Sequence, residues 1–168
     1  TITGNGAARA LPGDHLVILD GISDVVLDGF TISGGTADGA APDDSGAGIY
    51  GADLNASVKI VNCRFTDNQA DAVGGAVFLD DASPVIDACW FIGNTAGSGG
   101  ALALQGTSDP LIQNAIFFQN RADLNGGAVH AAAGLTLSFC TLVENTAGGQ
   151  GGAVHAAAGT LAIEACIV

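Results

Sequence analysis

Acidic side chains are the most numerous groups that could do chemistry in this chain, with 17 aspartates and glutamates among 168 residues. Calcium binding would need several oxygens that converge from loops, and no segment matches an EF-hand loop or the calcium-binding nonapeptide repeat. A glycosidase needs carboxylates on both sides of one bond, whereas Asp80 and Asp81 are adjacent and would diverge. We interpret these residues, and Asp43 and Asp44, as solvated carboxylates in corners and in an insertion.

The basic residues argue against lyase chemistry. A lyase that resembles pectate lyase would need an arginine or lysine base beside calcium-binding aspartates, and the catalytic signatures of polygalacturonases are also missing. The four basic residues are scattered through the sequence: Arg9, Lys59, Arg64 and Arg121. We therefore predict a protein that is not an enzyme, with no catalytic residue, no cofactor and no metal ion.

The four cysteines could form disulfides. Cys63 and Cys89 are 26 residues apart, and so are Cys140 and Cys166. If this spacing is one turn of a stacked structure, the Cα atoms of each pair lie ~4.8 Å apart, within the range for a disulfide. Stacked side chains point the same way, however, and cysteine is an ordinary small core residue, like Ala115 at the same position. Both states stay open, and we favour free thiols; no Cys-x-x-Cys or histidine spacing indicates zinc.

The elements that carry these groups follow a repeat of 25 to 27 residues. Each repeat has a large apolar residue two positions after the cysteine position, an asparagine three positions later, and then a Gly-Gly-Ala block. The apolar position holds Phe65, Phe91, Phe117, Leu142 and Val168, the next holds Asn68, Asn94, Asn120 and Asn145, and the blocks begin at Gly74, Gly99, Gly126 and Gly151. A repeat this short cannot bury its own apolar face and must stack on copies of itself.

Within each repeat, apolar and polar residues alternate with a period of two, which is typical of short strands with one buried face. Glycine and asparagine punctuate the strands and tolerate the left-handed backbone of a sharp corner. The sequence therefore predicts an all-β fold, a parallel β-solenoid with about 25 residues per coil, roughly six coils and three short strands per coil. Phenylalanine rings and asparagine amides should form ladders along its axis.

We expect a single domain, 1–168. Its first coils, 1–56, are irregular and hold an insertion at 33–46; regular repeats follow at 57–82, 83–107, 108–133 and 134–158, with a partial repeat at 159–168. Ile2 and Val168 both fall at the Phe65 position, and neither end shows a polar cap. Either adjoining coils of a longer surface protein cover the ends, or subunits stack end to end into a fibre.

The pairing of Phe-x-x-Asn, as in Phe65 to Asn68, with Gly-Gly-Ala-Val or Gly-Gly-Ala-Leu resembles the repeat of the chlamydial polymorphic outer membrane proteins. It is also similar to the wider set of bacterial surface proteins built on right-handed parallel β-helix repeats. The resemblance implies a right-handed β-helix at the cell surface, associated with an outer membrane, or outside the cell. Such repeats are scaffolds of adhesins, autotransporter passengers and polysaccharide-degrading enzymes.

Alternation also places a row of side chains on the outer surface. The row consists of Tyr50, Phe78, Ala103, His130 and His155, and Trp90 with Ile116 forms a second outward pair. Aromatic faces bind sugars and apolar protein surfaces, so both strips are candidate contact sites. The alternative is that a solvated sheet face simply tolerates these residues.

The net charge of −13 disfavours nucleic acid and anionic membrane surfaces as partners and is compatible with a basic partner or bound cations. No apolar run is long enough to span a bilayer and no signal peptide is present, so we expect a mature product or an excised piece. We expect an extracellular or cell-surface structural or adhesive β-helix, whose partner is its own coils or copies, a glycan or a host-surface protein. The alternative is the non-catalytic or partial scaffold of a polysaccharide lyase or glycoside hydrolase.

Overall fold

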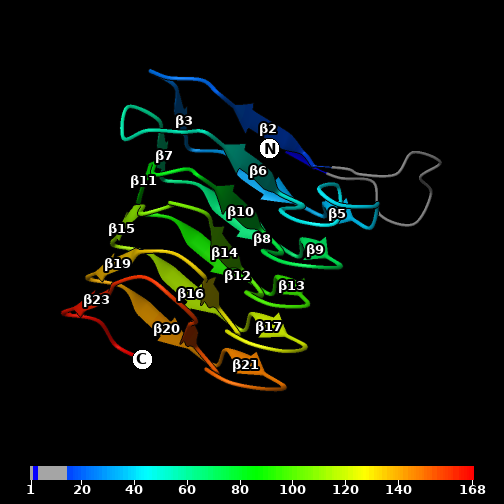
Figure 1. The fold of residues 1–168 in the computed structure, drawn as a ribbon, viewed down its shortest axis with the longest axis vertical. Helices are drawn as coiled ribbons and strands as arrows, with labels where there is room; N and C mark the ends of the chain where they lie inside the picture. Colours follow the sequence, from blue (N-terminus) through cyan, green and yellow to red (C-terminus); the bar gives the residue numbers. More distant parts are fainter. Residues whose placement is uncertain (1, 4–14) are drawn as a thin grey trace.

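The computed structural model describes residues 15–168 and the backbone of residues 2–3. These residues wind into a stack of coils, and four parallel sheets run along the stack (Figure 1). Each sheet takes one strand from each successive coil, as expected when a repeat places equivalent residues side by side. The described residues form strands, turns and bends, which confirms the all-β parallel solenoid.

Two of the sheets contain the longer strands. What we call the groove sheet consists of β2 (Val17–Asp20), β6 (Ile49–Ala52), β10 (Val77–Asp80), β14 (Leu102–Gln105), β18 (Val129–Ala131) and β22 (Val154–Ala156). The lateral sheet, at the left of Figure 1, consists of β3 (Val26–Asp28), β7 (Lys59–Val61), β11 (Val85–Asp87), β15 (Leu111–Gln113), β19 (Leu135–Ser138) and β23 (Leu161–Glu164).

The other two sheets hold the aromatic ladder and the shortest strands. The phenylalanine sheet consists of β1 (Ile2–Thr3), β4 (Thr31–Ser33), β8 (Arg64–Thr66), β12 (Trp90–Ile92), β16 (Ile116–Phe118) and β20 (Thr141–Val143). The short sheet, at the right of Figure 1, consists of β5 (Thr36–Ala37), β9 (Gln69–Ala70), β13 (Thr95–Ala96), β17 (Arg121–Ala122) and β21 (Thr146–Ala147).

The strand register matches the repeat. Phe91 pairs with Phe65 on one side and Phe117 on the other. The ring centroids lie 4.9 and 4.7 Å apart, with the ring planes within 4° and 5° of parallel. Ile2 pairs with Ile32, which pairs with Phe65, so Ile2 belongs to this column as predicted. The expected phenylalanine ladder is therefore confirmed.

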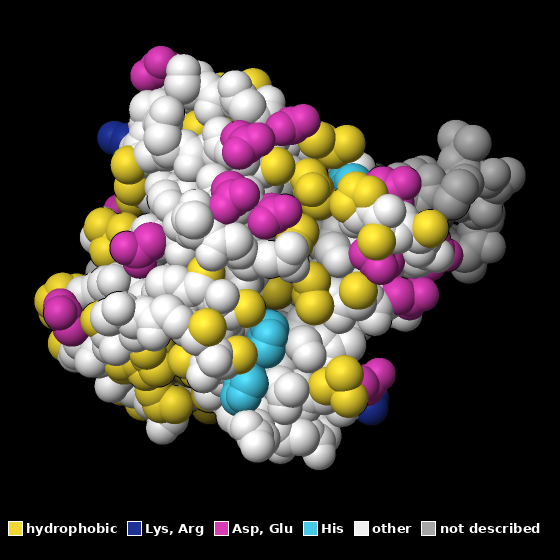
Figure 2. Space-filling model, viewed as in Figure 1, with side chains coloured by type: hydrophobic (Ala, Val, Ile, Leu, Met, Phe, Trp, Pro, Cys, Tyr) yellow, Lys and Arg dark blue, Asp and Glu magenta, His cyan; other side chains and the backbone are white. Residues whose placement is uncertain are grey.

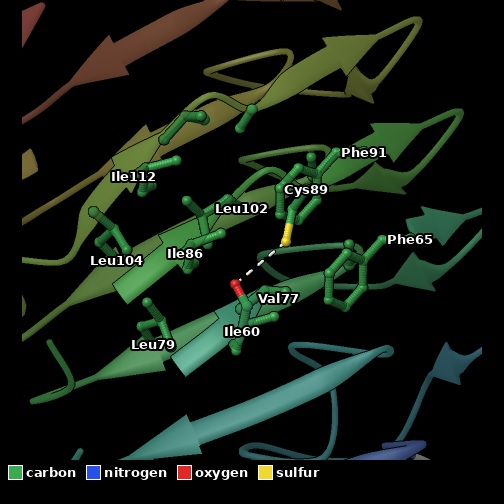
Figure 3. Packing of buried hydrophobic residues seen from close by; sticks show 14 of the residues in the cluster. Ile60, Phe65, Val77, Leu79, Ile86, Cys89, Phe91, Leu102, Leu104 and Ile112 are labelled. Atoms are coloured by element: carbon green, nitrogen blue, oxygen red, sulfur yellow. Dashed lines mark hydrogen bonds between the residues drawn. The ribbon is translucent and has the colours of Figure 1, made fainter. Parts of the chain in front are cut away.

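Inward side chains of three sheets meet in one apolar core (Figure 3). Ile60, Ile86 and Ile112 stack from the lateral sheet and are fully buried, and Leu79 and Leu104 face them from the groove sheet. Ala37, Ala47, Ala70 and Ala96 form a separate small cluster beside the short sheet. All four members are alanines, so this cluster is packed by methyl groups alone.

Two numerical predictions were wrong. Each regular coil has four short strands rather than three, because the residues after the asparagine, such as Gln69–Ala70, pair with their equivalents in a strand of two residues. The number of regular turns is about 4, of ~26 residues each, rather than roughly six. The irregular first coils and the partial last one add the further strands of the six-stranded sheets. The count is lower because the first coils carry the insertion and the segment 159–168 completes only part of a turn. Within the described residues, no helix is long and apolar enough to cross a membrane.

Candidate functional site

The outward row predicted from the sequence lies along the groove sheet. Tyr50 pairs with Phe78, Phe78 with Ala103, Ala103 with His130, and His130 with His155 in the strand register. His15 extends the row at the other end, with its ring 5.0 Å from that of Tyr50. The rings of Tyr50 and Phe78 are 5.7 Å apart, so three aromatic rings from successive coils lie in contact.

The middle of this row is covered. Phe78 is only 5% exposed and Ala103 is also buried, whereas Tyr50, His130 and His155 are half-buried. The loop at 41–45 and the corner at 72–73 lie against Phe78 and line a pocket beside it. The outward row is therefore not one continuous exposed strip. It consists of a pocket near Tyr50 and, separately, a histidine pair.

The pocket near Tyr50 has a volume of about 290 Å³. Tyr50 and Phe78 supply its aromatic side, and Asp80 and Gln105 supply polar groups. The remaining lining residues come from the insertion and the next corner: Ala41, Pro42, Asp44, Ser45, Ala72 and Val73. Aromatic faces next to planar polar side chains can bind the apolar and hydroxyl-bearing faces of a sugar, or a side chain of a protein partner.

Carboxylates dominate the electrostatics of this pocket. Burial, followed by the charges of Asp80 and Asp20, raises the pKa of Tyr50. Burial also raises the pKa of Asp80, and the charges of Asp81 and Asp53 add to this. The pocket therefore favours ligands that donate hydrogen bonds or carry positive charge.

The two C-terminal members of the row form a bonded pair. The Nδ1 atoms of His130 and His155 lie 3.1 Å apart, and His155 Nε2 is 3.1 Å from Gln150 Oε1. Figure 2 shows two adjacent histidine side chains, coloured cyan, on this face of the molecule. Burial, and then the neighbouring His155, lower the pKa of His130, so its imidazole is neutral at neutral pH.

The second predicted strip lies on the outer face of the phenylalanine sheet. Trp90 pairs with Ile116 and is 46% exposed. The guanidinium carbon of Arg64 lies 5.8 Å from the centre of the Trp90 ring, which is a cation–π distance. The outward direction of Trp90 agrees with the alternation, and Arg64 covers part of the ring.

The acidic corners hold hydrogen bonds between coils. Asp81 accepts bonds from the backbone nitrogen and hydroxyl of Thr107, which lower the pKa of Asp81. Asp87 accepts a bond from the Asn114 amide in the same way. In the described part of the chain, no three histidine, cysteine or acidic side chains group closely enough to hold a metal. Arg9 lies outside the described residues.

The cysteines are free thiols, as favoured from the sequence. Cys89 donates to Ile60 O at 3.4 Å, the bond drawn in Figure 3, and Cys140 donates to Ile112 O at 3.6 Å. Each of these sulfurs thus donates to a carbonyl of the preceding coil. Stacked side chains that point the same way do not have the geometry of a disulfide.

Replacing Cys140 by alanine should make the free energy of unfolding depend less on pH in the alkaline range. Burial raises the pKa of Cys140 to about 11, above its value of ~8.5 in an unfolded chain. Between these values only the unfolded chain loses the thiol proton, so the free energy of unfolding falls as pH rises, by ~1.4 kcal/mol per pH unit. Urea denaturation across this range should show a shallower fall in Cys140→Ala. Alanine should fit at this position, because Ala115 occupies the same column and is buried. Equal slopes of unfolding free energy against pH in the two proteins would contradict a buried Cys140 thiol.

Sequence reasoning missed the parts of the site that come from outside the repeat. His15 and the wall at 41–45 have no repeat equivalent, and the bond between His130 and His155 depends on ring orientation. The sequence did contain one signal for the contact between Gln150 and His155. An amide side chain precedes each histidine by five residues, Asn125 before His130 and Gln150 before His155.

Comparison with known proteins gives the family. The whole chain, residues 1–168, matches the family model described as "Right handed beta helix region". No curated protein and no solved structure matches the chain.

Proposed function

Since the chain belongs to the right-handed β-helix family, we propose that it is a structural or adhesive β-helix of the cell surface or extracellular space and that it catalyses no reaction. The resemblance of its Phe-x-x-Asn and Gly-Gly-Ala repeats to those of the chlamydial polymorphic outer membrane proteins supports this location. The fold also serves enzymes, so the alternative function is the scaffold of a polysaccharide lyase or glycoside hydrolase.

The last coil carries the proposal, because its inward columns are open to solvent. Ile163 lies over Leu137 in the lateral sheet and is 43% exposed, and Val168 is 70% exposed. Ile112 and Phe117, at the equivalent positions of an inner coil, are fully buried. Another coil of the same kind would bury these side chains and pair the open strand edges. A β-helix coil, either an adjoining one or that of a second copy, would fit this face.

A contact role has separate support from the pocket near Tyr50. It lies beside the covered row, and its lining combines Tyr50 and Phe78 with Asp80 and Gln105. This combination suits a glycan or a protein side chain, in agreement with the adhesive role. The face shown in Figure 2 carries several acidic side chains and few basic ones, which favours partners of neutral or positive charge.

Ile163→Lys should weaken self-association of the purified chain. A charged side chain in this inward column cannot be buried between two coils without a partner charge. Sedimentation velocity over a concentration series should show association of the unmodified chain and mostly monomer for Ile163→Lys. Electron microscopy should show rods longer than one molecule. Val143→Lys is the control, because Val143 is exposed on the side wall in β20.

Two results would contradict the proposal. The first is a chain that stays monomeric at every concentration, and the second is a side-wall variant that disrupts association as much as Ile163→Lys. Either result would rule out association through the end face. Turnover of a substrate in a polyuronate panel, abolished by replacing one carboxylate, would select the enzyme scaffold instead.

A further inference from the structure

The histidine pair has an unusual orientation for stacked residues. Side chains in the same rotamer on neighbouring coils keep equivalent atoms about one strand spacing apart, ~4.8 Å. The ring centroids of His130 and His155 are 5.1 Å apart, but their Nδ1 atoms are only 3.1 Å apart. The two Nδ1 atoms therefore face each other across the gap between the coils.

Gln150 determines which nitrogen of His155 carries the proton. Its Oε1 is an acceptor, so His155 donates from Nε2, and the neutral ring then has a lone pair on Nδ1. The backbone nitrogen of Gln150 donates to Asn125 Oδ1 at 2.9 Å, which attaches residue 150 to the preceding coil. His130 must then donate its Nδ1 proton to His155, because two facing lone pairs would repel each other.

We propose that a divalent transition-metal ion of the zinc and copper class replaces this shared proton and binds Nδ1 of both His130 and His155. Neutral imidazole nitrogens are preferred ligands of such ions. With metal–nitrogen bonds of ~2.05 Å, the 3.1 Å separation corresponds to an angle of roughly 100° at the metal, between the octahedral and tetrahedral values. Both rings must rotate so that each Nδ1 lone pair turns by about 40° from the line between the two nitrogens and aims at the ion.

The surroundings agree with this assignment. The ion displaces the proton from His130 Nδ1, and Nε2 of the same ring can take up a proton from solvent, so both rings stay neutral. The bond from His155 Nε2 to the side-chain amide oxygen of Gln150 can orient the ring as the carboxylate or carbonyl partner of a metal-binding histidine does. No third histidine, cysteine or acidic side chain joins the pair in the described residues, so water completes the coordination.

Titration of the intact chain with Zn²⁺ and with Cu²⁺, followed by calorimetry, tests the site. We expect one ion per chain for at least one of the two metals, and loss of this binding, by tenfold or more, in both His130→Ala and His155→Ala. Alanine at this position is compatible with folding, because Ala103 occupies it in the preceding coil. Gln150→Ala should weaken binding about tenfold through the lost orienting bond.

His15→Ala is the matched control, since His15 lies at the other end of the row beside Tyr50. It should leave binding unchanged, and the imidazole NMR signals of Nδ1 in His130 and His155 should move on metal addition. The proposal is overturned if neither metal binds, if His15→Ala removes binding equally, or if the Nε2 signals respond instead. Ca²⁺, which prefers oxygen ligands, should not bind at this pair.

Discussion

Gly100→Ala should destabilise the protein by about 3 kcal/mol or more, as measured by urea denaturation. A Cβ atom at Gly100 would overlap the carbonyl oxygen of Gly127 in the next coil and would lie 2.5 Å from Arg121 O. Backbone carbonyls held in the parallel ladders cannot move aside as a flexible side chain could. The next coil would have to move along the solenoid axis, away from the coil that contains Gly100. This movement would break the hydrogen bonds between the two coils.

The two glycines of each Gly-Gly-Ala block have different functions. The first, as at Gly99 with φ of +63°, adopts the left-handed conformation of a corner. The second, as at Gly100, has no such φ and is needed because the next coil approaches too closely for a side chain. The clash expected for Gly100→Ala therefore tests the stacking of coils rather than the turn itself.

Gly152→Ala provides the matched control. Gly152 occupies the same repeat position in the last coil, where an added Cβ would meet only Asn145 O, at an ordinary distance of 3.6 Å. Alanine there should be neutral or stabilise by ~0.4–1 kcal/mol, through a less flexible unfolded chain. Similar losses in both variants would show that the glycine requirement is local, and would contradict the close approach of coils.

The repeat made the ladders predictable. When a motif recurs after one turn, each residue meets its own equivalent, so the spacing of Phe65 and Phe91 is enough to predict their contact. The same logic predicted the asparagine ladder and the common direction of the cysteines. The strand Gln69–Ala70 was missed because two residues are too short to show alternation.

Features that depend on the insertion could not be predicted in this way. Phe78 points outward as expected, but Pro42 and its neighbours lie beside it, and nothing repeats in that loop. The bond between His130 and His155 is a second example, since a repeat predicts adjacency but not which ring edge faces the neighbour. The position of a group therefore followed from the sequence, whereas its exposure and bonding did not.

Asn94→Leu should cost on the order of 4 kcal/mol or more in the free energy of unfolding, because several buried hydrogen bonds would be lost at ~1–3 kcal/mol each. Asn94 Oδ1 accepts from the backbone and side-chain nitrogens of Asn68, at 3.1 and 3.0 Å. Its Nδ2 donates to Phe65 O at 3.1 Å and to Asn120 Oδ1 at 3.0 Å. Leucine is similar in size but offers none of these bonds, and it would leave the buried backbone N–H of Asn68 without this acceptor.

Asn145→Leu is the control at the end of the same ladder. Asn145 Oδ1 accepts from Asn120 and its Nδ2 donates to Phe117 O, but the residue is only partly buried. Asn145 makes three side-chain bonds rather than the four of Asn94, and its own side chain is partly exposed, so the expected loss is smaller than that of Asn94→Leu. Denaturant unfolding followed by circular dichroism measures both variants. Equal losses, or a loss below about 1 kcal/mol at Asn94, would mean that the asparagine column contributes little and that the apolar columns alone hold the coils together.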